Sequence, residues 1–376
     1  IGVAQWQYSA SSNARKTAGP LRERPADNAS VDFMGFRYRD TSVSAPQLAL
    51  RQWQNLANAG SVSLYIMGHL GNHQDRTALT ASKPAFDFHK AHEKLYAGLT
   101  SAAKVLLVNR PVMARNDPES YGWIRALTES HIPFDEMKLA ELKPELLHRW
   151  DVVILADLKK LTQEQAEMFD TYAEQGGTVL STGILPELRC LGICEVRNSW
   201  KDRMSSVFEL CEAEKTLFPR SAEAHYIAPG AILNEVVFCE QTQTCLHLIP
   251  EHPFGPPERC YYTEVSDIPG VGVTPYGKGK GVCLPWLAGS FYFNEGFDNT
   301  LHLIQDVLHQ ICGLPELAPG LHPSVELVLC KKTDRFLVQL INGSGVFANS
   351  YFRPIPMQKI ELHLPGMAGK SVKALN

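Results

Sequence analysis

The stretch Val31-Asp-Phe-Met-Gly-Phe36 is followed along the chain by Ser44-Ala-Pro-Gln47 and by an apolar run from Ser61 to Met67. The first and last of these are typical of short buried strands. The middle one begins a helix, because Ser44 can cap it, Gln47 can reach back, and the first turn tolerates a proline without an N–H. We expect this helix to end at Asn58-Ala-Gly60, with Gly60 in the left-handed conformation. Two buried strands joined by a helix predict a parallel βαβ unit.

Hydrogen-bonding side chains crowd the ends of both predicted strands. Ligands of parallel α/β folds bind beyond the carboxyl ends of the strands. We therefore predict a polar site for neutral polyols such as sugars, whose candidate binding residues are Trp6, Arg37, Tyr38, Arg39, Tyr65, His69, His73, Asp75 and Arg76. The alternative is a loop that is held by salt bridges and binds no ligand.

Composition limits the class of protein. A length of 376 residues suggests two or three domains. The net charge of −4 and the lack of a basic run argue against a nucleic-acid partner. No apolar stretch reaches the roughly 18 residues of a membrane helix, so we expect no membrane partner.

The nine cysteines lack the spacing of a zinc site, and only Cys190 and Cys194 stand out as a possible pair. We expect mostly free thiols in a reducing cytoplasm, and hence a cytoplasmic protein.

The first 102 residues predict more than one βαβ unit. Ile1 to Tyr8 is expected to form a strand and residues 9–30 a polar loop. One βαβ unit with one extra strand cannot close a sheet by itself, so we expect residues 1–102 to be the end of a (β/α)₈ barrel. The chain begins at Ile1 rather than Met and stops at Asn376 within a predicted β segment, which indicates a fragment cut at both ends.

A helix is expected from Pro84 to Leu99. It carries His89, His92 and Glu93 at helical spacing, which could form a metal site. We favour the alternative of surface side chains on a covering helix, and predict neither a metal nor a cofactor.

From Ala103 the pattern restarts as alternating strands and helices. Strands are expected at 104–108, 134–137, 151–155 and 178–181, and helices at 119–131, 162–175 and 297–312. This order predicts a three-layer, flavodoxin-like α/β domain over residues 103–316. The glycines at 277–281 run into a strand, which favours a hairpin turn over a phosphate-binding loop. Alternation from Val325 to His363 predicts a small antiparallel β domain over 317–376.

Class I glutamine amidotransferases have a related fold with a cysteine at a sharp strand-to-helix turn. Here the corresponding stretches are Ala156-Asp157-Leu158 and Thr182-Gly183-Ile184. Neither contains a cysteine nucleophile, so we expect that fold without that chemistry.

Several stretches resemble the end of the barrel in glycoside hydrolases related to the trimeric β-galactosidases. They are Gln5-Trp-Gln-Tyr-Ser-Ala-Ser11, Val31-Asp-Phe-Met-Gly-Phe-Arg-Tyr-Arg39, Ala57-Asn-Ala-Gly60, and Tyr65-Ile-Met-Gly-His69 with Asn72-His-Gln-Asp-Arg76. The strand at Val105 and the helix from Tyr121 resemble the start of the trimerisation domain that follows the barrel. The resemblance implies a (β/α)₈ barrel, a flavodoxin-like trimerisation domain and a small β-sandwich. It also implies a carbohydrate substrate and a homo-oligomer, namely a trimer.

The resemblance further implies cleavage of a glycosidic bond by two carboxylates, placed at the ends of barrel strands four and seven. If residues 31–36 are strand seven, its end carries Arg37-Tyr-Arg-Asp40 and no glutamate. Asp40 is therefore the candidate catalytic residue, and its alternative role is to pair with Arg37 or Arg39. Strand four would precede Ile1, so we expect the chain alone to be inactive.

Three functional hypotheses follow. The first is a β-galactosidase-like glycoside hydrolase, present here as a C-terminal fragment. The second is a non-catalytic carbohydrate-binding or oligomerisation protein on the same scaffold, which the missing glutamate favours. The third is an amidotransferase-like enzyme, which the missing cysteine disfavours.

Overall fold

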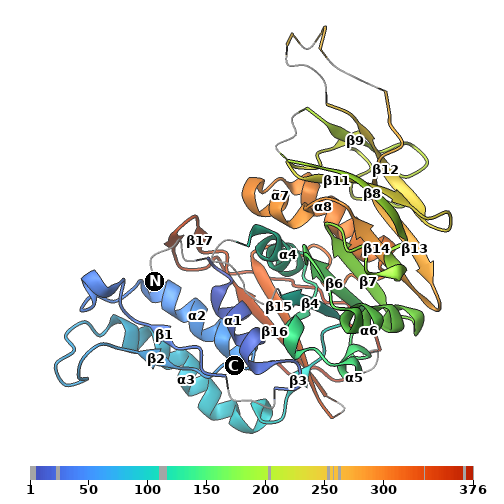
Figure 1. Ribbon diagram of the computed structural model, residues 1–376. Coiled ribbons are helices and arrows are strands. Elements are labelled where there is room, and N and C mark those ends of the chain that lie inside the picture. The colour runs from blue at the N-terminus through green and yellow to red at the C-terminus, as the bar shows by residue number, and fades with distance from the viewer. Residues whose placement is uncertain are drawn as a thin grey trace. The chain divides into compact units, whose positions relative to one another are not determined.

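The computed structural model describes residues 6–22, 26–109, 117–201, 205–251, 255–256, 258–260, 264–333, 335–366 and 370–375 (Figure 1). The chain forms two compact units. Unit 1 comprises Ile1–Ala103, Leu127–Met137 and Glu316–Asn376, and unit 2 comprises Lys104–Ala126 and Lys138–Pro315. The expected domain borders near residues 103 and 316 coincide with two places where the chain passes from one unit to the other. Because the first and last segments share one unit, the division into three domains stays a prediction.

The predicted parallel βαβ unit is present in unit 1. β1 (Ser30–Val31) pairs in parallel with β2 (Leu64–Tyr65), with Val31 opposite Tyr65. They are joined by the 3₁₀ helix η1 (Phe36–Tyr38) and by α2 (Ala45–Ala57). α3 (Thr77–Tyr96) follows β2 and lies beside α2 (Figure 1).

The two strands are shorter than predicted. β1 ends at Val31 instead of Phe36, because Phe33 bridges back to Ser42 and the chain turns into η1. α3 begins at Thr77 and contains Pro84 in its interior, whereas the sequence predicted a start at Pro84. The Asp75 carboxylate accepts a hydrogen bond from Thr77 N at 3.0 Å, and this satisfies a backbone donor that would otherwise lack a partner in the first turn.

The end of α2 also differs from the prediction. Ala59, with φ 63°, takes the left-handed conformation that was expected for Gly60. Gly60 is instead closely packed: a Cβ there would lie 3.2 Å from the Ala14 Cβ and 3.2 Å from Asn55 O, so these neighbours would have to move by a few tenths of an ångström. Ser44 precedes the helix but makes no side-chain cap.

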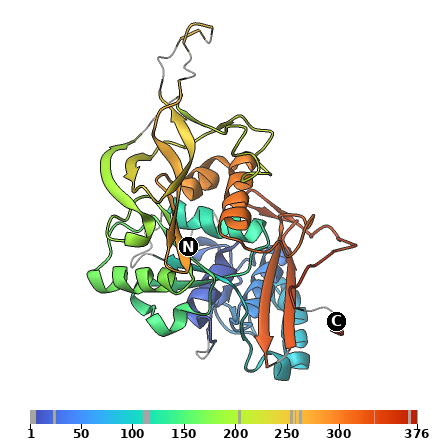
Figure 2. The same cartoon turned by 90° about the vertical axis from the view of Figure 1, so that its right-hand side faces the viewer.

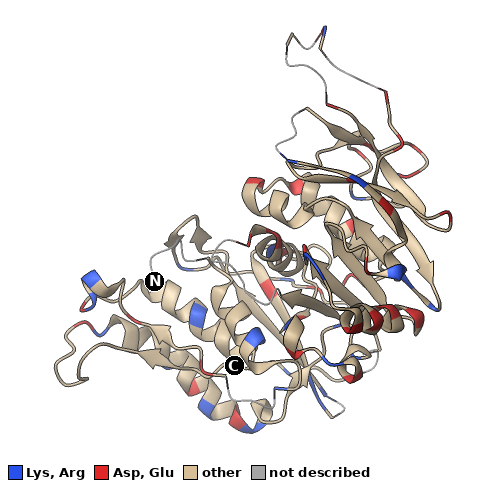
Figure 3. Cartoon of the chain, in the orientation of Figure 1, with Lys and Arg blue, Asp and Glu red and all other residues tan. Residues whose placement is uncertain are grey.

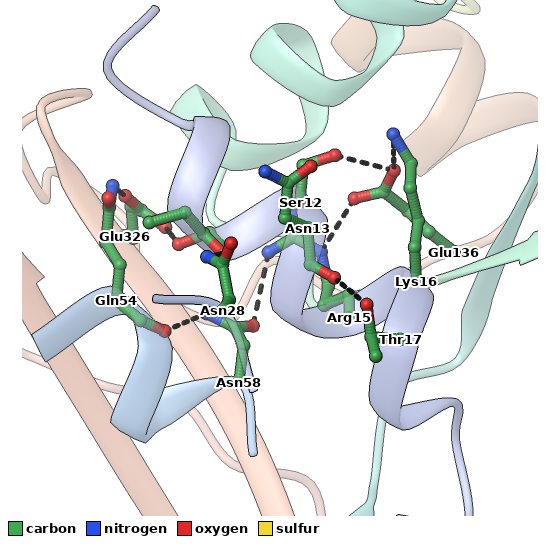
Figure 4. Close-up of polar contacts among 12 residues, drawn as sticks. Ser12, Asn13, Arg15, Lys16, Thr17, Asn28, Gln54, Asn58, Glu136 and Glu326 are labelled. Carbon is green, nitrogen blue, oxygen red and sulfur yellow. Dashed lines mark hydrogen bonds and ion pairs between the residues drawn. The ribbon is translucent and has the colours of Figure 1, made fainter. Parts of the chain in front are cut away.

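α1 (Ser9–Ala18) occupies a stretch that was predicted to be a polar loop. Its inward face is made of small residues, and its buried hydroxyls bind carboxylates of other segments of unit 1 (Figure 4). Ser11 Oγ donates to Glu326 at 2.6 Å, and Ser12 Oγ donates to Glu136 at 3.0 Å. The helix is therefore held by polar tertiary contacts that leave no apolar periodicity in the sequence. Residues 1–5 of the strand predicted before it lie outside the described residues.

Unit 1 is completed by antiparallel strands from the end of the chain. β15 (Val325–Lys332) pairs with β16 (Arg335–Asn342) and with β3 (Thr100–Ser101), and the first two lie in the stretch that was predicted to be antiparallel β. β16 lies beside α2 (Figure 2). A short hairpin of β17 (Val346–Phe347) and β18 (Ser350–Tyr351) follows, whereas residues 360–364, at the end of the predicted β alternation, form no strand.

Unit 2 is built on a mixed sheet whose strands in this unit follow the order β10-β9-β12-β13-β14-β7-β6-β4. β4, β6, β7 and β14 run parallel, and the strands from β14 to β10 are joined by antiparallel pairing. The bounds of the strands are β4 Val105–Asn109, β6 Val152–Ala156, β7 Thr178–Thr182, β9 Val207–Glu209, β10 Tyr226–Ile227, β12 Gln243–Ile249, β13 Pro269–Tyr276 and β14 Gly279–Leu284.

The helices of this unit are α4 Pro118–Glu129, α5 Pro144–Leu147, α6 Gln163–Glu174, α7 Ala288–Glu295 and α8 Asp298–Asp306, the last continued by the π-helical turn Val307–Ile311. Three of them, α4, α6 and α8, lie where the sequence predicted helices, and α5 and α7 were not predicted. The predicted start of α6 is confirmed by a full capping box between Thr162 and Gln165. The predicted hairpin turn is also confirmed, with Tyr276 opposite Gly279. The predicted strand at 134–137 is β5 (Phe134–Lys138).

Residues 185–270 received no sequence prediction beyond the cysteine pairing. They contain the 3₁₀ helix η3 (Arg189–Leu191) and the pair of β8 (Ile193–Trp200) with β11 (Leu233–Phe238). A disulfide joins Cys194 to Cys239 across this pair. The pairing of Cys190 with Cys194 was wrong: Cys190 lies buried in η3 as a free thiol, and six further cysteines are also free.

Candidate functional site

The carboxyl ends of β1 and β2 lie side by side in unit 1, because the two strands are parallel neighbours. Backbone bonds continue this pairing by one residue, since Asp32 N donates to Tyr65 O at 3.0 Å. The segments that follow, 32–42 and 66–76, carry all of the predicted site residues except Trp6 and Tyr65. We define the strand-end site as these two segments together with Tyr65.

A buried carboxylate and a buried imidazole meet in the strand-end site. Asp32 is 1% exposed and His73 is 9% exposed. His73 Nε2 lies 3.0 Å from Asp32 Oδ2. The distance is that of an ion pair, and apart from this contact both Asp32 oxygens and His73 Nε2 make no hydrogen bond with the described residues. The pair therefore has hydrogen-bonding capacity that the protein leaves unfilled.

The environment of Asp32 favours its protonated form. Burial raises the pKa of Asp32, and the neighbouring His73 only partly opposes this effect. A carboxyl group with a raised pKa keeps its proton closer to neutral pH, which suits it to hold or transfer a proton.

Asp75 has the opposite character. Its Oδ2 accepts from Ser42 N at 2.9 Å and its Oδ1 from Thr77 N at 3.0 Å. These backbone donors lower the pKa of Asp75 to about 2. Asp75 thus joins the segment after β1 to the start of α3 and remains anionic. Its contacts describe a structural role, and its predicted part in ligand binding stays a prediction.

Exposed aromatic and cationic side chains surround the strand ends. Phe36, Tyr38 and Tyr65 are 66%, 64% and 47% exposed. Phe33 lies under them, with its ring centroid 5.7 Å from that of Phe36 and 6.0 Å from that of Tyr65. Exposed polar side chains on the same segments are Arg37, Arg39, Asp40, His69 and Arg76. Aromatic faces beside planar donors and acceptors are suited to sugar rings, which present both C–H faces and hydroxyl groups.

Trp6 is placed elsewhere in unit 1. It precedes α1, and its ring makes an edge contact with Tyr8 at 5.5 Å between centroids. Tyr8 is buried and donates from its hydroxyl to Glu129 at 2.9 Å. This contact fixes the entry to α1, and a role of Trp6 in binding stays a prediction.

Sequence reasoning missed Asp32. It expected the strand to run to Phe36, so it sought the strand-end carboxylate at Asp40. Because β1 ends at Val31, the residue that directly follows the strand is Asp32. The available signal was a carboxylate within an otherwise apolar run, since a buried charged residue is rare unless it is paired or functional.

The alternative metal site on α3 finds no support in the structure. His92 stacks on Phe88 at 4.5 Å, and His89 makes an edge contact with Tyr96 at 5.6 Å. No group of three or more His, Cys, Asp or Glu side chains in the described ranges could hold a metal ion. As far as those ranges extend, no helix is both long enough and apolar enough to cross a membrane.

Comparisons with known proteins agree on the fold. No protein-family model and no curated protein sequence matches this chain. Among solved structures, alpha-L-fucosidase isoenzyme 2 from Paenibacillus thiaminolyticus matches 96% of this chain at a TM-score of 0.72 and 17% identity, over 56% of its own length. The beta-galactosidase from Bacillus circulans sp. alkalophilus matches 90% at a TM-score of 0.63 and 13% identity, over 52% of its length. The cold-adapted beta-galactosidase from Rahnella sp. R3 matches 89% of this chain at a TM-score of 0.62 and 13% identity, over 52% of its own length.

These likenesses confirm the glycoside hydrolase-related fold that the resemblance implied. The scaffold is like that of glycosidases, and the chain spans about half the length of the hydrolases it matches. At such low identity the likeness concerns the fold, and the activity must be argued from the site.

Proposed function

We propose that this protein is a β-galactosidase-like glycoside hydrolase that binds carbohydrate at the strand-end site. The observation that carries the proposal is the buried Asp32–His73 pair, placed directly at the carboxyl ends of two parallel strands and beside exposed aromatic rings. Support comes from the glycosidase-like scaffold, because active sites of parallel α/β barrels lie at this end of the strands. The completed barrel and the flavodoxin-like and β-sandwich domains belong to the same proposal.

Glycosidic bonds are cleaved by two carboxyl groups, one of which must donate a proton. In this proposal Asp32 is the strand-end carboxyl group, since its raised pKa suits a proton donor. His73 positions Asp32 through their close contact. Asp40 is the competing candidate, but it is exposed and lies beyond η1.

The proposal is tested by binding and by turnover. We expect isothermal titration calorimetry of the 376-residue chain with galactosides and fucosides to detect binding. Arg39→Ala and His69→Ala should each weaken binding by about fivefold, as loss of one hydrogen-bonding partner does. Lys83→Ala is the control, because Lys83 is exposed on α3 and forms an ion pair with Asp87 on the same helix. Unaltered titration curves for both site variants would remove Arg39 and His69 from the site.

Turnover separates the two catalytic candidates. In the longer barrel protein that this proposal implies, hydrolysis of aryl galactosides or fucosides is expected to fall at least about a hundredfold in Asp32→Asn, as loss of a general acid does. If Asp40→Asn loses activity and Asp32→Asn keeps it, the assignment moves to Asp40.

A second function is favoured by one observation. Asp75 uses both oxygens on backbone donors, so Asp32 is the one buried carboxyl group of the described strand-end site with unfilled capacity. A protein with one such group could bind sugar without cleaving it. Sugar binding by the longer barrel protein, with no hydrolysis of any aryl glycoside, would favour this non-catalytic function.

The assembly and the location are part of the proposal. We propose a homo-oligomer, a trimer by resemblance, with a carbohydrate as substrate. The seven free cysteines support a cytoplasmic location, whereas the Cys194–Cys239 disulfide is of a kind more common in oxidising compartments.

A further inference from the structure

The helices that follow β1 and β2 both begin at the strand-end site. The chain leaves each strand at its carboxyl end, and Val43, just before α2, donates from its backbone N to Asp32 O. α3 begins directly after segment 66–76. Neither α2, of 13 residues, nor α3, of 20 residues, has an acidic residue in its first turn. Because a helix start carries partial positive charge, this end of unit 1 favours an anion.

The carboxyl groups nearest to these helix starts are already used by the protein. Asp75 accepts from Ser42 N, before α2, at 2.9 Å and from Thr77 N, at the start of α3, at 3.0 Å. One carboxylate thus serves both helix starts. Asp32 favours its protonated form, because burial raises its pKa. These two groups therefore add little negative charge that an incoming cation would find.

The exposed charges of the strand-end site are mostly positive, although the whole chain has a net charge of −4. Arg37, Arg39 and Arg76 are exposed, against the single exposed carboxylate of Asp40. Arg37 and Arg39 make no hydrogen bond or ion pair with the part of the chain that the structure describes. Arg76 Nη2 donates to the backbone of Leu70 at 3.1 Å. Guanidinium groups bind carboxylate and sulfate groups through paired N–H donors.

Exposed arginines alone would be equally consistent with a hydrated surface. Here they lie on the same two segments as the buried Asp32–His73 pair, whose further hydrogen-bonding capacity is unfilled. The same segments also expose the rings of Phe36 and Tyr38, at 66% and 64%. A ligand that has a ring face, hydroxyl groups and a negative charge can use all three kinds of group.

From this combination we propose that the carbohydrate of the strand-end site is an acidic sugar, whose carboxylate or sulfate group is bound by Arg37, Arg39 and Arg76. This inference rests on the proposed function, because it names the class of sugar that the same site binds. A neutral sugar would leave the guanidinium groups and the helix starts without a counter-charge. An anion beside Asp32 would also favour the protonated form that a proton donor requires.

Matched sugars test the inference. The neutral probe is methyl β-galactoside, and the acidic probes are methyl β-galacturonide and the methyl β-galactoside that is sulfated at its primary hydroxyl. By isothermal titration calorimetry of the 376-residue chain, at least one acidic probe is expected to bind about tenfold more tightly than the neutral probe, as a contact of opposite charges near a protein surface allows. The tighter of the two identifies the acidic group. The preference should fall in about 0.5 M sodium chloride, which screens exposed charges.

The outcomes separate this inference from the proposed function. If neither acidic probe binds more tightly than the neutral one, the inference is overturned and the proposed function stands. If neither acidic probe binds at all, the inference is also overturned. The proposed function fails with it when neutral galactosides and fucosides do not bind either.

Variants locate the acidic group. Arg37→Gln and Arg39→Gln are each expected to reduce the preference for the acidic probe by about fivefold, since each removes one charge–charge contact. Neither arginine makes a contact that the fold needs, so both variants are expected to fold. Arg335→Gln is the matched control, because Arg335 is exposed on β16, a strand that contacts the far end of α2 through Gln339 and Ala57. A preference that is unchanged in both site variants would place the acidic group elsewhere and overturn the inference.

Discussion

At the residue scale, Asp32 of the proposed site carries a cost in folding stability. Its carboxyl group is almost fully buried, and burial raises its pKa. Ionisation of Asp32 is therefore less favourable in the folded chain than in the unfolded chain. The stability that this group contributes is complete below its unfolded pKa near 3.8 and is lost as the pH rises through its higher folded value. Residues that lower the stability of the folded chain in this way are typical of functional sites.

The first prediction concerns Asp32→Asn. Because the amide does not ionise, the variant is expected to be more stable than the wild type at pH 7, with a Tm higher by about 2 °C. The difference should shrink as the pH falls below 4, where the wild-type carboxyl group is protonated. Thermal unfolding followed by circular dichroism between pH 3 and 8 measures this. Asp40→Asn is the control, since substitution of an exposed residue is expected to shift the free energy of unfolding by less than about 0.5 kcal/mol. A lower Tm of Asp32→Asn at pH 7 would contradict the prediction.

Asp75→Asn should show the opposite dependence on pH. The pKa of Asp75 is lowered to about 2 by backbone donors, so its contribution to stability is present above pH 3.8 and is lost as the pH falls through 2. At pH 7 we expect the variant to lose about 1 kcal/mol of unfolding free energy. The same pH series measures this loss, which should disappear toward pH 2. A loss that is independent of pH would mean that the carboxylate charge is not the source.

At the scale of elements, α1 shows how polar contacts can hold a helix. Glu136 is buried and receives Ser12 Oγ at 3.0 Å, Arg15 Nε at 3.0 Å and Lys16 Nζ at 3.2 Å (Figure 4). The Arg15 guanidinium also lies 4.2 Å from the ring centroid of Phe134. Three side chains of α1 thus contact the single carboxylate of Glu136. Figure 3 shows the chain in the orientation of Figure 1, with Lys and Arg in blue and Asp and Glu in red.

Removing that carboxylate tests its importance. Glu136→Ala is expected to destabilise the chain by about 3 kcal/mol, because it leaves the Arg15 charge without its buried partner. Urea unfolding measures the change. Glu141→Ala is the control, since Glu141 is exposed and its contact with Lys138 is 3.5 Å long, and it should cost less than about 0.5 kcal/mol. If the two variants lose similar stability, the contacts of Glu136 do not hold α1.

The disulfide of β8 and β11 allows a further prediction. Cys194 and Cys239 are separated by 45 residues, and a cross-link over a loop of this length restricts the unfolded chain by about 4 kcal/mol on the chain-entropy model. Cys194→Ser, or dithiothreitol added to the wild type, is therefore expected to lower the urea midpoint. Cys211→Ser is the control, because Cys211 is a free thiol. An unchanged midpoint on reduction would show that the bond does not stabilise unit 2.

The accuracy of the sequence predictions varied with the kind of signal. β4 and β6 were found because continuous apolar runs mark strands buried on both faces, and α6 because Thr162 and Gln165 form its cap. α1 was missed because its buried face consists of Ala and Ser, whose partners Glu136 and Glu326 are far away in the sequence. Asp32 was missed for a similar reason: the end of β1 is set by a tertiary bridge from Phe33 to Ser42, and no local signal marks it.

At the scale of the whole molecule, unit 1 exposes apolar side chains near the end of the chain. Phe336 and Leu340 lie on the edge strand β16, and Phe347, Phe352 and Ile355 follow it, with exposures of 37% to 77%. An exposed edge strand with apolar side chains is prone to pair with another chain. A group of such side chains also favours an interaction surface.

The last prediction is the assembly of the chain in solution. If the resemblance to trimeric β-galactosidases extends to assembly, sedimentation equilibrium should give three times the 41.8 kDa of one chain. Phe347 is the most exposed of the five side chains, at 77%, so Phe347→Glu is expected to preserve the fold and, if this surface joins the chains, to shift the equilibrium toward monomer. Lys331→Glu on β15 is the control for added negative charge. A monomer at all concentrations would exclude the trimer for this chain, and a trimer unaffected by Phe347→Glu would move the interface away from this surface.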